Sequence, residues 1–315
     1  MPSEPLSDML KLLNAKSVLT GAVIAGGAWS IRFPPPEKIK FWGIVKGCCW
    51  LQTGDEGVPI KLQSGDVLLV LRPTPITLAS DLGVASISHD ELRSRQIDEV
   101  SRIGDGEDED FILIGGTAVL DPSGRSLLFD ALPPMIHIDS GTPQAEALHW
   151  ILDQMIRERA NRQPGAGAAL TQLAHLLFIH ILRAHLQRQG STGPGWLRLA
   201  SDRRLAPALA LMHEQPGKDW RLPELAKAAG MSRATFALHF KTASGVGPLG
   251  YLTAWRMRLA ERALRQNRAP IAKLAESLGY ANESAFSHAF KRVTGRAPKR
   301  VHREEGSLIM EPVDL

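Results

Sequence analysis

The pattern F-K-x3-G-x2-P occurs twice near the C-terminus, as FKTASGVGP over 240–248 and as FKRVTGRAP over 290–298. The preceding segments also align, with LPELAKAAGMSRATFALHFK beside IAKLAESLGYANESAFSHAFK. Such self-similarity indicates that one supersecondary unit has been built twice. Each copy predicts a short helix, a turn at a glycine and a second helix.

The positions that recur have the same expected roles in both copies. They are the inward face of the first helix, a glycine at a turn that favours positive φ, a helix N-cap, and an i,i+4 pair of phenylalanines that docks the second helix on the first. These positions are Leu225, Ala226, Gly230, Ser232, Phe236 and Phe240 in the first copy, and Leu274, Ala275, Gly279, Asn282, Phe286 and Phe290 in the second. This is the pattern of a helix-turn-helix, whose second helix enters the major groove of DNA.

A predicted helix, PLGYLTAWRMRLAERALRQN, joins the two copies. Pro248 suits its first position, and Pro270 is expected to begin the next helix in the same way. About 18 helical residues give a rod of roughly 27 Å. With helix widths added, this length approaches the ~34 Å between successive major-groove faces. One chain is thus expected to read two adjacent segments of the groove. The alternative, that these helices only pack together, gives no reason for the repeat to stay in register.

The charge distribution also favours nucleic acid as a partner. The chain has 315 residues and a formal net charge of +4, but residues 196–303 carry 20 Lys and Arg against 7 Asp and Glu, a net charge of +13. The remaining residues have a net charge of −9. A basic third on an acidic body is typical of DNA-binding proteins, although surplus basic residues also decorate ordinary solvated surfaces.

Residues from about 205 to 303 closely resemble the DNA-binding domain of AraC/XylS transcription regulators, and GYANESAFSHAFKRVTGRAP is the most diagnostic segment. The resemblance implies an all-α C-terminal domain with two helix-turn-helix motifs, double-stranded promoter DNA and RNA polymerase as partners, and activation more often than repression. By position in the family, the candidates for base contacts are Arg233, Ala234, Ala237 and Leu238 in the first copy, and Glu283, Ser284, Ser287 and His288 in the second. The candidates for phosphate contacts are Lys241, Lys291, Arg292, Arg296 and Lys299.

The chemistry of the two reading helices differs. Alanine and leucine can make only apolar contacts, for instance to a thymine methyl, whereas serine, glutamate and histidine offer donors and acceptors to base edges. The family often has arginine where this chain has Leu238 and His288, so strong readout of guanine is not expected from these positions. Arg233 is the best candidate for a base or phosphate contact. The alternative for each basic residue is solvation alone, and for His288 a place on the helix surface.

The first half of the chain reads as β-structure. Short apolar runs between about 18 and 138, such as FWGIVKGCCWL, DVLLVL, FILIGGTAVL and SLLFDAL, are separated by turn clusters and predict a small sandwich or barrel. The segments GCCWLQ, LQSGDVLLVLRPTP and LFDALPPMIHI resemble the cupin-like sensor domain found in one large subgroup of AraC/XylS regulators.

Two helices are expected after this β-region. QAEALHWILDQMIRERANR places Leu148, Ile151, Leu152, Met155 and Ile156 on one face, and AALTQLAHLLFIHILRAHLQ is apolar over more than half its circumference. Because that surface is wider than one domain needs, we expect a dimer interface. The fold class is therefore α+β with several domains: a cupin-like sensor at 1–142, a helical dimerisation region at 143–189, a linker at 190–197, a DNA-binding domain at 198–303 and a tail at 304–315.

The sensor domain offers weak signs of metal chemistry. Its strand region has His89 and His137, which form no H-x-H pair, and Thr77 stands where cupin-like sequences frequently have histidine. His175, His180 and His185 are spaced by five residues and do not share a helical face. We expect no metal, no cofactor and no catalytic residue.

The adjacent cysteines are the only two in the chain, which excludes a disulfide framework and a zinc site. Neighbouring residues of a strand point to opposite faces, so Cys49 is expected to face inward and Cys48 to lie beside Lys46 and Trp50. A neighbouring lysine can lower the pKa of a thiol, which makes Cys48 a candidate oxidant sensor. The alternative is a buried cysteine that acts as a small hydrophobic residue.

We interpret the chain as a cytoplasmic, dimeric, sequence-specific transcription regulator controlled by a small molecule or a redox signal, and not as an enzyme. The N-terminus lacks the features of a signal peptide, and the longest weakly polar run, LTGAVIAGGAW, is too short and too rich in glycine to span a membrane. One alternative is a cupin-type binding protein or enzyme with a vestigial DNA-binding domain. Another is an architectural DNA binder with little sequence preference.

Overall fold

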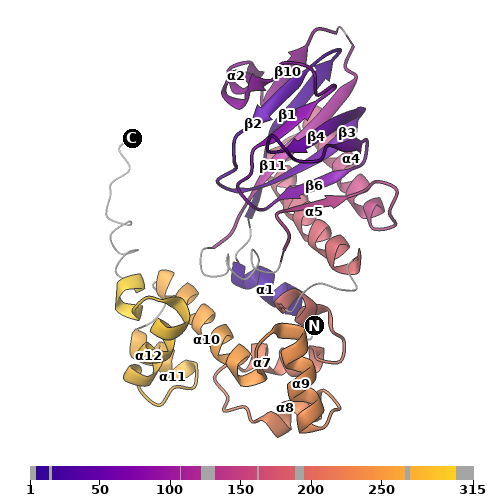
Figure 1. The fold of residues 1–315 in the computed structure, drawn as a ribbon. Helices are drawn as coiled ribbons and strands as arrows, with labels where there is room; N and C mark the ends of the chain where they lie inside the picture. The colour runs from indigo at the N-terminus through magenta and orange to yellow at the C-terminus, as the bar shows by residue number, and fades with distance from the viewer. Residues whose placement is uncertain are drawn as a thin grey trace. The chain divides into compact units, whose positions relative to one another are not determined.

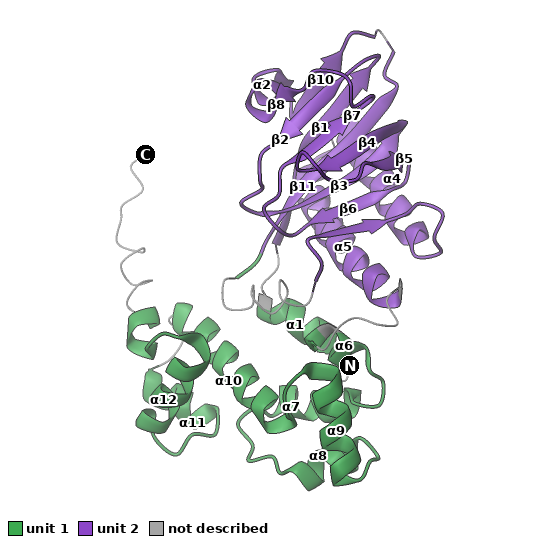
Figure 2. Cartoon of the chain, viewed as in Figure 1, with its two compact units in different colours: residues 1–14, 120–131, 191–315 green, residues 15–119, 132–190 purple. Residues whose placement is uncertain are grey.

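The computed structural model describes residues 5–13, 16–106, 108–121, 132–161, 163–188, 195–266 and 270–302. The chain divides into two compact units (Figure 2). One unit comprises residues 15–119 and 132–190, and the other comprises 1–14, 120–131 and 191–315. We call them the sensor unit and the helical unit.

The sensor unit is built on two facing β-sheets (Figure 1). The larger has the order β12-β6-β3-β11-β1-β10-β9, and the smaller β5-β4-β7-β2-β8. The strands of the larger sheet are β1 (Lys16–Gly26), β3 (Ile39–Lys46), β6 (Val67–Val70), β9 (Gln96–Ile97), β10 (Val100–Gly104), β11 (Phe111–Val119) and β12 (Met135–Ile138). Those of the smaller sheet are β2 (Ser30–Phe33), β4 (Cys48–Thr53), β5 (Ile60–Gln63), β7 (Ile76–Ala79) and β8 (Ile87–Ser88), after which comes the short helix α2 (His89–Ser94). The expected sandwich or barrel is confirmed.

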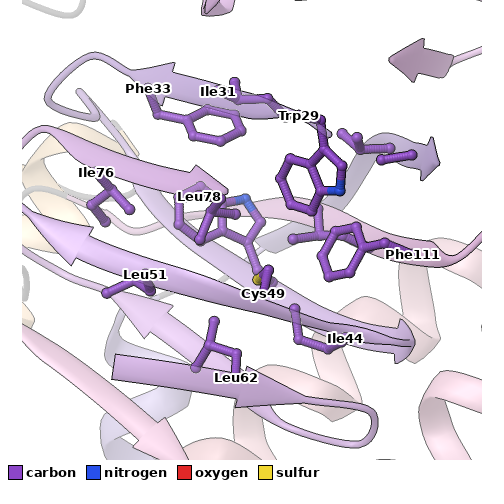
Figure 3. Packing of buried hydrophobic residues seen from close by; sticks show 14 of the residues in the cluster. Trp29, Ile31, Phe33, Ile44, Cys49, Leu51, Leu62, Ile76, Leu78 and Phe111 are labelled. Atoms are coloured by element: carbon purple, nitrogen blue, oxygen red, sulfur yellow. The ribbon is translucent and has the colours of Figure 1, made fainter. Parts of the chain in front are cut away.

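The core of this unit lies between the two sheets (Figure 3). Trp29 and Phe111 pack ring against ring, with centroids 4.6 Å apart, and Phe33 packs on Trp42 at 5.0 Å. The run FWGIVKGCCWL does not form one strand. Gly47, with φ +79°, ends β3, and the chain crosses there to β4 in the other sheet. A glycine suits this corner because positive φ carries no penalty for it.

Two helices, α4 (Ala145–Asn161) and α5 (Ala166–Arg188), pack on the larger sheet. Of the predicted apolar face of α4, Leu148, Ile151, Leu152 and Met155 are buried, whereas Ile156 is half-buried. Gly43 of β3 allows the close approach, because a Cβ there would lie 2.4 Å from a methyl group of Leu152. These helices belong to the same compact unit as the sheets rather than to a separate region.

The helical unit contains the predicted repeat. Its helices are α1 (Pro5–Leu13), α6 (Trp196–Ser201), α7 (Ala206–Glu214), α8 (Leu222–Ala228), α9 (Arg233–Ser244), α10 (Pro248–Arg265), α11 (Ile271–Ser277) and α12 (Glu283–Thr294). Two hydrophobic clusters hold the two helix-turn-helix motifs. Phe236 and Phe240 lie in the first and Phe286 and Phe290 in the second, and α10 contributes side chains to both.

The two copies reproduce each other at the level of hydrogen bonds. Ser232 Oγ accepts from the backbone N–H of Thr235 at 3.2 Å, and Asn282 Oδ1 accepts from that of Ala285 at 2.8 Å, so both predicted N-caps are confirmed. The turn glycines have φ +63° at 230 and +79° at 279. The glycines of the F-K-x3-G-x2-P pattern, Gly245 and Gly295, end α9 and α12 in the left-handed conformation. The repeated letters therefore specify helix ends and core contacts.

Two expected boundaries need correction. Trp196 already begins α6, so the end of the expected 190–197 linker is helical, while 190–194 lies outside the described residues. Pro270 is the N-cap of α11 rather than its first residue, unlike Pro248, which is at the first position of α10. The tail at 304–315 and most of the SLLFDAL run also lie outside the described residues.

The N-terminal helix is the larger correction, because α1 belongs to the helical unit and not to the expected sensor domain at 1–142. Leu6, Met9 and Leu12 of α1 are buried, and α1 packs on α6, α7 and α10. Nδ1 of the buried His213 lies 3.1 Å from Asp8 Oδ2, and its Nε2 lies 2.8 Å from the Tyr251 hydroxyl. Burial lowers the pKa of His213, against an opposite effect of the neighbouring Asp8 carboxylate. These two polar contacts of His213 add to the otherwise apolar packing of α1 on α7 and α10.

Candidate nucleic-acid interface

The first reading helix, α9, presents its predicted contact residues on the surface. Arg233, Ala234 and Leu238 are exposed and Ala237 is half-buried, while the phenylalanines of the same helix face the core. Leu238 is 70% exposed, which is unusual for leucine and suits an apolar contact outside the domain. Arg233 is the first residue after the N-cap, and N-terminal residues of a recognition helix are the ones that contact base edges.

The second reading helix, α12, lines a shallow hollow of about 460 Å³. Its wall includes all four predicted base-contact residues of this copy and two predicted phosphate residues: Glu283, Ser284, Ser287, His288, Lys291 and Lys299. Carboxylate, hydroxyl and imidazole groups thus share one concave surface with two ammonium groups. Such a set can accept from cytosine N4, exchange hydrogen bonds with other base edges and hold the flanking phosphates.

The remaining phosphate candidates are also accessible. Lys241, Arg292 and Arg296 are exposed, as are Lys291 and Lys299. Lys241 and Lys291 occupy equivalent places, three residues before the ends of α9 and α12. The structure therefore brings each group of candidates to the surface of its own helix-turn-helix.

One residue that the sequence did not single out connects the two motifs. The guanidinium of Arg256, on α10, donates to the backbone carbonyls of Pro216 and Lys218, the latter at 2.8 Å, and lies over the Tyr280 ring at 5.9 Å. Loop 216–218 precedes the first motif, and Tyr280 belongs to the turn of the second. Gly217 and Gly279 meet there backbone to backbone, because a Cβ on Gly279 would lie 2.2 Å from the Gly217 carbonyl oxygen. Arg256 thus holds the two motifs in a fixed relation.

The predicted inward orientation of Cys49 and outward orientation of Cys48 are confirmed. Cys48 is exposed, Cys49 is 2% exposed, and burial raises the pKa of Cys49 to about 12. Lys46, however, donates from Nζ to the Glu109 carbonyl at 2.7 Å, so its hydrogen bond goes to the backbone and not to the Cys48 thiol.

The two histidines of the strand region lie in separate settings. His137 Nε2 is 3.0 Å from the buried carboxylate of Asp66, whereas His89 packs beside Phe33 with ring centroids 5.6 Å apart. Among the residues that the structure describes, no three His, Cys, Asp or Glu side chains gather as a metal site would require. His89 instead lines a basic pocket with Lys40 and Arg93, a grouping that no pattern in the sequence indicated.

By length and composition, the α5 stretch Ala166–Gln187 is apolar enough to cross a membrane, and 28% of its 18-residue apolar window is buried. This helix packs on α4 and on strands β1, β11 and β12. A helix of this kind also occurs as a packing helix in proteins without a membrane part.

Comparison with known proteins agrees with this architecture. A family model described as cupin matches residues 4–187, and one described as a helix-turn-helix domain matches 225–304. An AraC-like transcription regulator of Streptomyces antibioticus is 41% identical over 94% of this chain and 97% of its own length. RclR of Escherichia coli, described as an RCS-specific HTH-type transcriptional activator, is 32% identical over 94% of this chain and 95% of its own length. Among solved structures, the DNA-binding domain of AdpA in complex with a target DNA is 25% identical over 35% of this chain and all of that one, with a TM-score of 0.33.

The two helix-turn-helix motifs, the cupin match over residues 4–187 and the near full-length match to the AraC-like regulator all indicate the same family. The chain belongs to the AraC family of DNA-binding transcription regulators, in the group with an N-terminal cupin domain, and is a regulator rather than an enzyme.

Proposed function

We propose that this regulator is a homodimeric activator that acts in the cytoplasm, binds promoter DNA through α9 and α12 of each protomer, and responds to a small molecule held by its cupin domain. The observation that carries the proposal is the exposure of equivalent faces on both reading helices. Arg256 and the 18-residue helix α10 fix these helices in one unit. A rigid pair of this kind suits two successive major-groove segments on one face of the duplex.

Base and phosphate contacts have separate roles in this proposal. Arg233 and the α12 hollow read bases, with Leu238 contributing apolar contact. Lys241 and Lys291, together with Arg292, Arg296 and Lys299, hold the backbone, which sets register without reading sequence. Because the base-reading chemistry differs between the helices, the two half-sites are expected to differ in sequence.

The dimer is assigned to the helices of the sensor unit. Trp150 of α4 is 57% exposed, and it lines a hollow with Leu176 and His180 of α5. An exposed tryptophan beside half-buried apolar residues is typical of a protein interface. Dimerisation through this surface would bring two DNA-binding units to one promoter.

Activation and contact with RNA polymerase are the finer parts of the proposal. They are supported by the description of RclR as an activator, at 32% identity over nearly the whole chain. Transcription in vitro from a bound promoter, with and without the regulator, tests them. Stimulated transcript supports activation, and reduced transcript identifies a repressor.

The experiment that tests DNA recognition is capture of fragmented genomic DNA on the full-length protein at ~0.15 M salt, near the physiological value, followed by sequencing. The proposal predicts a few discrete sites. Uniform retention with a steep salt dependence would instead indicate an architectural DNA binder. A matched control is the doubly substituted Arg233→Ala, Ser284→Ala protein, which should retain DNA with much less selection among sites.

An oxidant signal is the second candidate, and the exposed Cys48 favours it. RclR, by its description, is RCS-specific. Neighbouring side chains on opposite faces of β4 do not suit a disulfide between Cys48 and Cys49, so a redox response would act through Cys48 alone or between two chains. The test compares the oxidant response of Cys48→Ser with that of the parent protein, and Cys49→Ser serves as the buried control. If Cys48→Ser responds as the parent does, this candidate is wrong.

A further inference from the structure

A pocket of about 500 Å³ opens at one end of the space between the two sheets of the sensor unit. Lys40 and Thr117 form one of its walls, since they are paired across β3 and β11 and point to the same side. Phe33, Trp42 and the 34–36 proline segment give it an apolar lining. A second hollow of about 190 Å³ adjoins it and shares Lys40, Trp42, His89 and Arg93 with it. This volume lies in the range of small-molecule sites.

The charges around this pocket are unbalanced. Lys38, Lys40, His89 and Arg93 line it, and Glu37 is its one acidic lining residue. Of the acids on α2, Asp90 lies 4.0 Å from His89, and Glu91 pairs with Arg95. Throughout the described part of the chain, no carboxylate forms an ion pair with Lys38, Lys40 or Arg93. Burial, and then the charges of Arg93 and Lys38, lower the pKa of Lys40.

A half-buried cation without a counter-ion is costly, and a bound anion would offset that cost. The positive charge around the pocket also affects His89. Burial and the charges of Lys40 and Arg93 lower the pKa of His89, against a smaller opposite effect of Asp90. The planar guanidinium of Arg93 matches a carboxylate, with Lys40 as a second, point-like donor. The apolar lining beside these groups requires a ligand with an apolar body.

We propose that this pocket binds a small organic anion, namely a carboxylate carried on an apolar body, with Lys40 and Arg93 at the carboxylate and Phe33 and Trp42 against the body. That this anion is the effector rests on the proposed function. The occupancy of the pocket does not depend on that function.

The test uses the full-length protein without DNA and three probes that share one ring system: 1-naphthoate, 1-naphthalenemethanol and 1-naphthylmethylamine. Isothermal titration calorimetry measures the affinity of each. The carboxylate is expected to bind about 10- to 100-fold more tightly than the alcohol, as a charge-assisted hydrogen bond implies, and the ammonium more weakly than either. Equal affinity for acid and alcohol, or no binding of naphthoate, would overturn the proposal.

Variants assign the binding to this site. Lys40→Met removes the charge but keeps an unbranched side chain only one atom shorter, and should remove about tenfold or more of the naphthoate affinity while leaving that of the alcohol unchanged. Arg93→Gln, on the exposed surface of α2, should act in the same direction and does not disturb the sheet. Lys61→Met, an exposed lysine of β5 outside the pocket, is the control and should bind as the parent does. Unchanged naphthoate affinity in both pocket variants would overturn the assignment.

Operator affinity, measured by fluorescence anisotropy with and without naphthoate, separates this proposal from the proposed function. If naphthoate binds with the expected head-group preference and operator affinity stays the same, the anion pocket is supported, and the role of such an anion as effector is contradicted. If the protein binds its operator but no naphthoate, the pocket proposal alone fails.

Discussion

Cys48 and Cys49 have opposite environments because neighbouring side chains of β4 point to opposite faces. The raised pKa of Cys49 keeps its thiol protonated at about pH 8, whereas an exposed cysteine reacts there through its thiolate. A chromogenic disulfide reagent should therefore titrate one thiol per native chain and two after unfolding. Cys48→Ser should abolish the native reaction and Cys49→Ser should preserve it. Two reactive thiols in the native protein would contradict the burial of Cys49.

Arg233 and Lys241 lie on the same helix and should affect DNA binding differently. Arg233→Ala should cost about 1–3 kcal/mol on the specific site and much less on unrelated DNA, because a base contact is lost. Lys241→Ala should weaken both by similar factors and reduce the salt slope by about 0.9 for the lost phosphate contact. Fluorescence anisotropy over a series of salt concentrations measures both quantities. Equal losses of Arg233→Ala on both DNAs would reassign Arg233 to the backbone.

At the scale of elements, the two helix-turn-helix copies differ in what surrounds their turn glycines. A Cβ added at Gly230 would meet only open space, so Gly230→Ala should cost only the strain of positive φ, roughly 1–2 kcal/mol. Gly279 lies against the Gly217 carbonyl, so Gly279→Ala should add an overpacking cost of about 1–3 kcal/mol. Urea unfolding of the two variants measures the difference. Equal free energies of unfolding would show that loop 216–218 does not pack on the second motif.

The sequence predicts a helix or strand well where neighbouring residues alone determine where it begins and ends. The helix ends of α9 and α12 follow from Ser232, Asn282 and the glycines after them, because caps and left-handed residues are local signals. The docking of α1 is not local. A nine-residue amphipathic helix shows that one face is covered, and it does not show by which partner. The basic pocket escaped prediction for the same reason, since Lys40, His89 and Arg93 meet only through sheet pairing and the return of α2.

At the scale of the whole molecule, the proposed dimer can be tested with two exposed tryptophans: Trp150 lies in the proposed interface, and Trp50 lies outside it and serves as the control. Both are exposed, at 57% and 36%, but Trp150 is on α4 and Trp50 is on the smaller sheet. Trp150→Glu should shift the protein from dimer to monomer in sedimentation equilibrium, because burying a carboxylate at an apolar contact is costly. Trp50→Glu should leave the dimer intact. If Trp50→Glu gave the monomer and Trp150→Glu left the dimer intact, the interface would lie on the smaller sheet rather than on α4.

The central claim is that one protomer reads two adjacent major-groove segments with α9 and α12, held in place by α10. The most direct measurement is methylation-protection and hydroxyl-radical footprinting on a captured site, with wild-type protein and with Ser287→Ala, His288→Ala. The account predicts two protected major-groove segments about 10 base pairs apart on one face of the duplex. In the variant, only the segment assigned to α12 should lose protection. A single protected segment, or loss of both segments together, would contradict this account.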